Sequence, residues 1–460
     1  MQAPDPALVD DQVQAASTSF GCQFEALVRG ASCMSLIVLE DFGGVELPWH
    51  DVRMAQTKGF PMVNAQAPGL RRCLVTLTSI LLMMSPVVAA TGAGASDAKA
   101  APMVVGDLCS CTGPQGSSIS QTTQTLQAWE SWVNAHGGIK NHRVTILVKD
   151  DESDPATATS AAKELIEQDH VIAIFDNSNE DVLWAGQARM AHVPILGGED
   201  SAIAASNPDV FPPGGTLAKS AFGSAQFVKK AGVKKMAILY CSESAACLQS
   251  SNLTRVDYGR VGIRVVYTDS IAFNEPNYAA QCLAAQQSGA TAMLVADASA
   301  IVSKVATDCA GQGYRPLQIS GDGAVAISWL AVPGMNGNID QEPNIPWFVH
   351  DAATKSMYAA LAKYAPAVLD QPDFGENVVQ AWSAGAELEA AAAASRLGVT
   401  PTSKEILSGL YAMTGTTLGG LAPHLKFVWG KVAQNGCYSM VMIEGGKFVD
   451  PSGPGFSCVK

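Results

Sequence analysis

Two residue pairs in this chain have types and spacings that could carry out chemistry. Asp150 and Asp151 could serve as a general acid and a general base, and Ser160 with Lys163 matches the Ser-x-x-Lys pattern of penicillin-recognising enzymes. The Lys-Thr-Gly motif that accompanies Ser-x-x-Lys is absent, and the match falls in the middle of a predicted helix. The Gly-x-Ser-x-Gly and Walker patterns are absent too. The sequence therefore predicts a protein that is not an enzyme.

Metal binding is the next chemistry that the residue types suggest. His136 and His142 flank a glycine turn, but no third ligand lies within reach along the sequence. Cys109 and Cys111 have the spacing of a metal or redox pair, yet no second cysteine pair follows at the spacing of a zinc site. We therefore expect no metal and no cofactor.

The charge of the chain excludes one class of partner. The 460 residues carry a formal net charge of −13, and no cluster of Lys and Arg is present. Binding to a phosphate backbone needs such a cluster, so we expect no nucleic-acid partner. The length and the 48% hydrophobic content are enough for two domain-sized cores.

A short segment has the pattern of an export signal. Arg71 and Arg72 precede an apolar run over residues 74–84, and small residues that include Val88-Ala89-Ala90 follow. A positive region, an apolar region of about 7–15 residues and a small-residue cleavage site form a secretory signal in this order. The apolar run is shorter than the about 20 residues that a transmembrane helix needs, which favours a cleaved signal. An uncleaved anchor is the alternative. We expect export to the periplasm or the cell exterior.

Residues 1–61 precede this signal and show little periodicity. We interpret them as a mis-called or disordered N-terminal extension with the true start at Met62, and an unusual leader is the alternative. Residues 62–101 are then the signal peptide and a linker. No cysteine follows the apolar run in the cleavage region, so we expect no lipid anchor.

Eight of the 11 cysteines follow residue 101, and an even number in an exported chain favours disulfides. Three pairs of sequence neighbours could each close a modest loop, and the two longer loops would each contribute about 3 kcal/mol or a little more. They are Cys241 with Cys247, Cys282 with Cys309, and Cys437 with Cys458. The sequence leaves the connectivity open, and with it the pairing of Cys109 and Cys111.

The elements that must position these residues alternate between strands and helices. From Met103 onward, short β-branched runs alternate with segments of helical period, which predicts a mainly parallel sheet with helices on both faces. One helix is predicted to start at Asp154, a capping residue, with Pro155 in its first turn. The predicted strands cover residues 104–108, 144–149, 171–175, 193–196, 236–240, 264–268, 292–296 and 317–320.

Two such α/β series are separated by a break rich in proline and glycine at residues 211–215. Alanine-rich helices are predicted at residues 352–364 and 375–397, with a shorter helix at residues 403–413. Residues 437–449 are predicted to form a hairpin that turns at Gly445 and Gly446. The pattern therefore indicates two α/β domains.

Four segments carry a resemblance to a known family. They are Thr112-Gly113-Pro114, Gly137-Gly138-Ile139, the sequence Val-Lys-Asp-Asp-Glu-Ser-Asp-Pro at residues 148–155, and Val193-Pro194-Ile195-Leu196. In order and spacing they resemble the type I periplasmic binding proteins, specifically the branched-chain amino acid receptors of ABC transporters. The likeness is strong over residues 103–209, weaker to Val449 and absent before Pro102.

The resemblance implies an α/β fold of two doubly wound parallel-sheet lobes joined by three crossing segments. Residues 102–215 with 347–420 would form the first ligand-binding lobe, and residues 216–346 with 421–460 the second. The crossings would lie at residues 211–215, 341–347 and 419–426. The ligand would lie between the lobes, outside the carboxyl ends of the strands, where backbone amides and helix N-termini point.

Matching positions with the family implies ligand contacts in both lobes. These contacts are Ser118, Asn177, Ser178, Asn179, Glu199 and Ser201 in the first lobe, and Ser244, Asp297, Ser299 and Asp322 in the second. Hydroxyl groups beside backbone amides suit a carboxylate, and Asp322 at a strand end could bind an ammonium group. The structural alternative is that Ser178 and Ser201 bond strand-end amides and that Asp322 caps the next helix.

The chain departs from the leucine receptors of this family at the predicted site. Ser118 stands where those receptors have Tyr, and Glu199 with Asp200 replaces small residues. The more acidic mouth favours a cationic or hydroxyl-rich solute over leucine, within a class led by amino acids and related amides or amines. We predict the extracytoplasmic solute-binding protein of an ABC transporter, a monomer whose partners are a small-molecule solute and a permease. The alternative is a ligand-sensing regulatory protein of the same fold.

Overall fold

A computed structural model describes residues 100–321 and 323–459 of the chain. The extension predicted over residues 1–61 lies outside the described residues, and so does the predicted signal and linker apart from residues 100 and 101. Asp322, one of the predicted ligand contacts, is also outside them.

The first lobe is built on a five-stranded sheet in the order β2-β1-β3-β4-β5, with every pair of neighbours parallel. Its strands are β1 (Met103–Cys109), β2 (Val144–Asp150), β3 (Ile174–Asn177), β4 (Ile195–Gly197) and β5 (Val210–Phe211). The connections carry α2 (Gly116–Ala135), α3 (Pro155–Glu167), α4 (Asp181–Met190) and the 3₁₀ turn η1 (Ala202–Ala205). Asp154 accepts a 2.8 Å bond from the Thr157 amide and Pro155 opens α3, so this helix begins where local chemistry predicts.

The second lobe is built on a sheet in the order β14-β13-β10-β9-β8-β6-β7, and β15 pairs with β13. Its parallel strands are β6 (Lys235–Cys241), β7 (Arg264–Ile271), β8 (Ala292–Ala296), β9 (Leu317–Ser320) and β10 (Ile339–Glu342). Antiparallel strands β13 (Cys437–Glu444), β14 (Lys447–Val449) and β15 (Ser457–Cys458) complete it. Its helices are α5 (Leu217–Lys230), α6 (Ala245–Arg260), α7 (Ala279–Gln287) and α8 (Ser299–Gly311), followed by the turn η2 (Ile327–Ala331).

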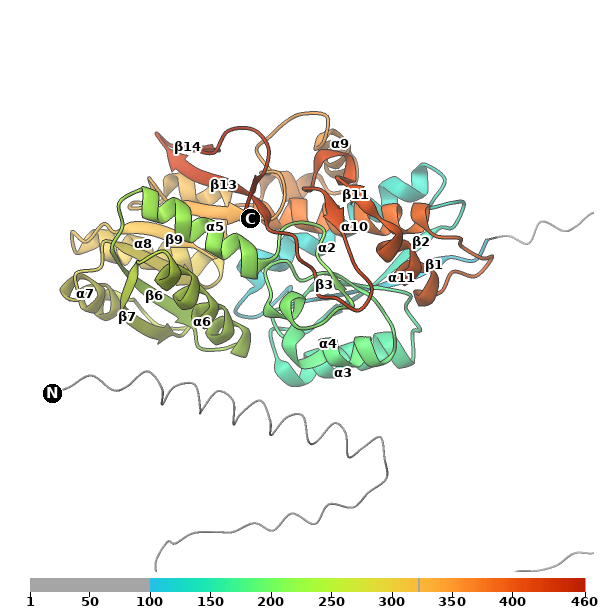
Figure 1. Cartoon of the computed structure of the whole chain (residues 1–460), viewed down its shortest axis with the longest axis horizontal. Coiled ribbons are helices and arrows are strands. Elements are labelled where there is room, and N and C mark those ends of the chain that lie inside the picture. The colour runs from blue at the N-terminus through green and yellow to red at the C-terminus, as the bar shows by residue number, and fades with distance from the viewer. Residues whose placement is uncertain (1–99, 322, 460) are drawn as a thin grey trace, which may run out of the picture. The chain divides into compact units, whose positions relative to one another are not determined.

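Three late helices return to the first lobe. They are α9 (Lys355–Tyr364), α10 (Glu376–Ala394) and α11 (Ser403–Ala412), with the turn η3 (Pro366–Asp370) after α9. Helices α9 and α10 pack against α2, and Figure 1 shows these orange and red helices beside the blue start of the described chain. Each lobe is therefore assembled from segments far apart in the sequence, as the predicted fold requires.

The chain passes between the lobes three times, after β5, after β10 and after β12 (Leu425–Lys426). Strand β12 pairs with β11 (Thr414–Thr416), and the turn η4 (Leu418–Gly420) lies between them. This pairing puts the third crossing after Lys426, further along than the predicted residues 419–426. The Asn344 side chain donates to the carbonyls of Pro213 and Leu421, at 2.9 and 3.4 Å, so the second crossing is bonded to the first and to the segment that precedes β12.

The predicted strands are all present, but the sequence missed several elements. Helix α6 has a polar sequence without a clear apolar stripe, and the missed strands β5, β12 and β15 have only two residues each. Strand β10 carries Asp340, Gln341 and Glu342, which are all buried, and Asp340 accepts a 2.9 Å bond from Ser320. Three polar residues in succession hid a buried strand from sequence reasoning.

Four disulfides join the cysteines of the described part. Three are the pairs expected from sequence, Cys241 with Cys247, Cys282 with Cys309, and Cys437 with Cys458. The fourth joins Cys109 to Cys111, the pair whose state the sequence left open. Within residues 100–321 and 323–459, no helix has the length and apolar character to cross a membrane.

Candidate ligand-binding site

Two adjoining hollows lie at the carboxyl ends of the parallel strands, and both lobes contribute residues to them. With their open mouths included, the first measures about 580 Å³ and the second about 720 Å³. They share Ile119, Asn179, Asp200, Ser250 and Asn377, so we call them together the cleft. Small-molecule sites usually occupy about 300–1,000 Å³, so the cleft has the size of a ligand site.

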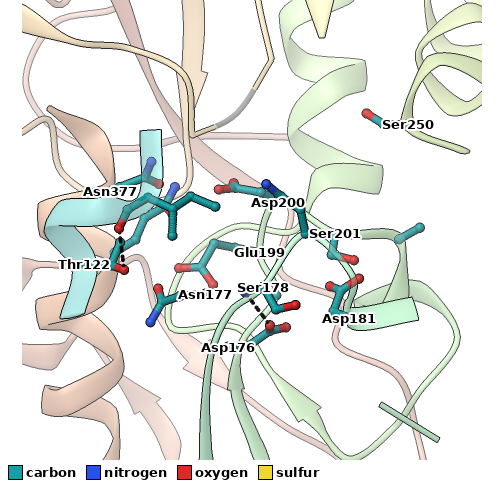
Figure 2. Close-up of a pocket in the computed structure, with 15 residues that line it drawn as sticks. Thr122, Asp176, Asn177, Ser178, Asp181, Glu199, Asp200, Ser201, Ser250 and Asn377 are labelled. Atoms are coloured by element: carbon teal, nitrogen blue, oxygen red, sulfur yellow. Dashed lines mark hydrogen bonds between the residues drawn. The ribbon is translucent and has the colours of Figure 1, made fainter. Parts of the chain in front are cut away.

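Four acidic side chains of the first lobe gather in the first hollow (Figure 2). Asp176 lies in β3, Asp181 is the first residue of α4, and Glu199 and Asp200 follow β4. Because β3 and β4 are neighbouring parallel strands, their carboxyl ends meet at one edge of the sheet. A Cβ on Gly198, whose φ is 72°, would lie 3.3 Å from Asp176 Oδ2, so glycine permits the close approach.

Burial changes the protonation of these acids. Desolvation raises the pKa of Asp181 to about 6 and the pKa of Asp200 to about 7. Desolvation and the neighbouring charge of Asp181 hold the pKa of Asp176 well above its usual range. Desolvation and the neighbouring charge of Asp200 do the same to the pKa of Glu199. These carboxyls therefore bind protons more tightly in the empty cleft than a carboxyl in water does.

The second lobe adds one more acid. Asp297 follows β8 and lines the second hollow, where its Oδ1 accepts a 2.7 Å bond from the Ala298 amide. Desolvation raises the pKa of Asp297 to about 7. The cleft thus has carboxyl groups on both lobes.

Two of the predicted first-lobe contacts have partners inside the protein. Ser178 Oγ donates to Asp151 Oδ2 at 2.5 Å and accepts from the Trp184 indole at 3.2 Å. Asn177 Nδ2 donates to Asp107 Oδ1 at 2.8 Å. These bonds stabilise the loop after β3, where the Glu180 amide also donates to Ser178 Oγ at 3.1 Å.

The acid pair Asp150 and Asp151 organises the turn that leads into α3. Asp150 accepts from the Thr112 hydroxyl at 2.8 Å and from the Glu152 amide at 2.9 Å. Asp151 Oδ1 accepts from the Ser153 amide at 2.8 Å. Both carboxyls are therefore occupied by local structure.

Direct hydrogen bonds join the two lobes across the cleft. The Ser299 amide donates to Ser118 Oγ at 2.7 Å, and Ser244 Oγ donates to the Asn179 carbonyl at 3.0 Å. All four residues were assigned to ligand contacts from the sequence. In the structure they bond to one another instead, and these bonds hold the two lobes together beside the cleft.

The structure brings most of the predicted contacts together. The predicted residues that line the cleft are Ser118, Asn177, Ser178, Asn179, Glu199, Ser201 and Asp297. Ser244 and Ser299 take part in the lobe contacts, and they do not appear among the described residues that line the two hollows. Ser201 Oγ accepts from the Ile203 amide at 3.2 Å, which caps η1, and it also bonds to Asp181.

Sequence reasoning missed several residues of the cleft, among them Asp176, Asp181, Asn377 and Gln380. Asp181 stands at the start of a predicted helix, where an acid is expected for the helix dipole alone. Asn377 and Gln380 come from α10, and Asn377 Nδ2 donates to the Ser118 carbonyl at 2.8 Å. No local signal connects residues so far apart in the chain.

Among the residues that the structure describes, no group of three His, Cys, Asp or Glu side chains could hold a metal ion. The cleft offers hydrogen-bond acceptors and negative charge to an organic molecule.

Fold and cleft together define a two-lobed solute-binding protein. Residues 102–447 match the periplasmic binding protein family, and the chain belongs to this family. The resemblance and the fold predicted from the sequence are thereby confirmed. The family consists of solute-binding proteins without enzymatic activity, and membership implies a location outside the cytoplasm.

Individual relatives are distant. A Leu/Ile/Val-binding protein homolog of Brucella melitensis biotype 1 is 23% identical over 295 residues, which are 62% of this chain and 79% of the relative. The solved structure of a branched-chain amino acid ABC transporter protein from Thermus thermophilus, with bound valine, has a TM-score of 0.68 at 13% identity, covering 78% of this chain and 97% of that one. A solute-binding protein from R. palustris in complex with benzoate has a TM-score of 0.63 at 18% identity, covering 78% and 96%. These two likenesses show the fold.

Proposed function

We propose that this chain is the extracytoplasmic receptor of an ABC transporter, which captures a small polar solute in the cleft and delivers it to a permease. The observation that carries the proposal is a cleft lined by both lobes, at the strand ends where α/β proteins bind ligands. Relatives described as ABC transporter proteins with bound valine or benzoate support it.

The solute belongs to a polar class, an amino acid or a related amide or amine. Amide, hydroxyl and carboxyl groups dominate the lining of the first hollow, and Ile119 and Ala202 are its only apolar side chains among the described residues. A solute that contacts both lobes binds the closed arrangement better than the open one, and so shifts the protein towards closure. One bound solute and one chain suffice for this, in agreement with a monomer.

A thermal-shift screen of the exported chain tests the proposal, with amino acids, amides, amines and sugars as candidates. A saturating solute should raise the melting temperature by mass action. At a solute concentration of a hundred times Kd, the free energy of unfolding should increase by about 2.7 kcal/mol. The same solute should make the protein more compact in small-angle scattering. Failure of every class to stabilise or compact the chain would contradict the receptor function.

A further inference from the structure

The acidic charge of the cleft has no basic counterpart. Asp176, Asp181, Glu199 and Asp200 line it from the first lobe, and Asp297 lines it from the second. Among the described residues of the lining there is no Lys, Arg or His. The salt bridges of the described part all involve residues elsewhere. Buried carboxylates are stabilised by a paired cation, and the protein supplies none here.

Unpartnered oxygens show where a cation would bind. Asp181 is only 2% exposed, and its Oδ1 is buried without a hydrogen-bond partner in the described part. Asp176 Oδ2, Asp200 Oδ1 and Asp297 Oδ2 are equally without one among the described residues. In the empty protein Asp181 can share a proton with Asp176. An ammonium group, with three donors and a positive charge, can replace that proton and reach further oxygens.

The second lobe offers few free amides to the carboxylate of an amino acid at the start of α8. Backbone amides at the start of α8 are the natural anion site there. The amides of residues 298–300 instead donate to the side chains of Asp297, Ser118 and Ser117, at 2.7, 2.7 and 3.5 Å. A solute carboxylate would have to break these bonds and would lie near Asp297. The lining therefore selects against an anion as well as for a cation.

The acids occupy both ends of one continuous space. Asp176 and Asp181 line only the first hollow, Asp297 lines only the second, and Asp200 lines both. Resting on the proposed receptor function, we propose that the solute is a linear diamine or polyamine, with one ammonium group among Asp176, Asp181 and Asp200 and a second at Asp297. Such a dication joins the two lobes by charge, and its methylene chain passes the shared residues between the two ends.

Isothermal titration calorimetry of the exported chain tests this proposal. The probes are the α,ω-diamines from 1,3-diaminopropane to 1,6-diaminohexane, together with spermidine, n-butylamine, L-lysine and L-leucine. At least one diamine or spermidine should bind about tenfold or more tightly than n-butylamine, because a second charged hydrogen bond is gained. L-Leucine should be the weakest ligand. Titrations in two buffers of different ionisation enthalpy should show proton release on binding below about pH 7.

Neutral isosteres then separate the two ends. Asp181→Asn should weaken diamine and n-butylamine binding alike, by about tenfold or more. Asp297→Asn should weaken the diamine by a similar factor and leave n-butylamine unchanged, because a monoamine uses only the first-lobe acids. Glu444→Gln, at an exposed position at the end of β13, is the matched control and should change neither affinity. Unfolding curves of the three variants show whether each is folded.

Two outcomes would overturn the diamine assignment. One is that no amine binds, or that L-leucine binds more tightly than every amine. The other is that a diamine binds equally well to both Asn variants, which would place it outside this cleft. If a different solute stabilises and compacts the chain in either case, the receptor function stands and only the assignment of the solute fails. If no class of solute stabilises or compacts the chain, both the receptor function and the diamine assignment are wrong.

Discussion

At the scale of single residues, the main feature of this protein is a set of buried carboxyl groups with raised pKa values. Asp107 is fully buried, and desolvation raises its pKa to about 6 even though Thr123 and Asn177 both donate to it. Asp200 is in a comparable situation, with desolvation the main cause of its raised pKa. Residues of this kind bind a proton more tightly in the folded than in the unfolded state, which couples protonation to stability.

The stability of the empty protein should therefore depend on pH in a defined direction. The pKa of Asp200 is about 7 in the folded chain, against 3.8 for an unperturbed Asp. Between these values the folded state holds a proton that the unfolded state releases, so stability falls as the pH rises from about 4 to about 7. The groups that face Asp200 are Asp181, Glu199, Gln380 of α10, and Asp340 and Glu342 of β10.

Urea unfolding near pH 5 and near pH 8 measures this effect. The wild-type empty protein should lose stability between the two, and Asp200→Asn should lose less, because that variant has no proton to release at this position. Ser452→Ala, an exposed position where no titratable group is removed, is the control and should keep the wild-type difference. An unchanged difference in Asp200→Asn would show that Asp200 does not hold a proton near neutral pH.

Close contact between elements depends on small residues in the helices of the first lobe. Helix α11 packs against α10, and a Cβ on Gly409 would lie 1.9 Å from the Ala391 carbonyl oxygen. A Cβ on Gly385 would lie 2.5 Å from the Trp129 ring, where α10 meets α2. The late helices can therefore approach the first lobe only because these positions lack a side chain.

Two glycine substitutions should change stability in opposite directions. Gly409→Ala should destabilise the protein by about 1–3 kcal/mol or more, since α10 and α11 must move apart. Gly186→Ala in α4 is the matched control: its Cβ would meet nothing within 4 Å, and helix propensity predicts a gain of up to about 1 kcal/mol. Thermal or urea unfolding of both variants measures the two changes in stability. Equal effects would mean that the contact between α10 and α11 does not limit the packing.

The disulfide between α7 and α8 should also contribute at this scale. Cys282 and Cys309 are fully buried and close a loop with a sequence separation of 27 residues. The double variant Cys282→Ala with Cys309→Ala should lose about 3 kcal/mol or somewhat more by loop entropy. Cys109→Ser with Cys111→Ser opens a separation of only two residues and should lose less. Peptide mapping without reduction should find both crosslinks, and free thiols at Cys282 and Cys309 in exported protein would count against the prediction.

At the scale of the whole molecule, the two lobes are joined by hydrogen bonds that exist only when the lobes meet. The amide of Ser299, which belongs to the second lobe, donates to the hydroxyl of Ser118 in the first. Solute and lobe contacts then act on the same equilibrium, because each favours closure.

Ser118→Ala tests this coupling. The variant leaves the Ser299 amide without its acceptor in the closed state, which should cost about 0.5–1.5 kcal/mol and weaken solute binding by about twofold to tenfold. Small-angle scattering should show less compaction than wild type at the same solute concentration. Ser452→Ala, at an exposed position near the C-terminus, should behave as wild type. Wild-type affinity and compaction in Ser118→Ala would show that this bond does not contribute to closure.

The sequence by itself determined the family, the two lobes, a set of cysteines even in number and suited to disulfides, and most strands and helices. These features depend on neighbours a few residues apart, such as Asp154 and Pro155 at the start of α3, and so they leave a local signal. The segments that resemble the family added the crossings and seven of the residues that line the cleft.

Only the tertiary structure decided which polar groups line the cleft and which of them bond to other groups of the protein. Ser178 looks free in sequence, but in the fold it bonds to Asp151 and Trp184, while Asp176 and Asp181 meet Glu199 and Asp200 across two strand ends. The return of α10 adds Asn377 and Gln380 from the far end of the chain, and β10 buries acids that a strand pattern would exclude. The physical reason is that burial and hydrogen bonding depend on the path of the whole chain, whereas helix and strand signals depend on residues close in sequence.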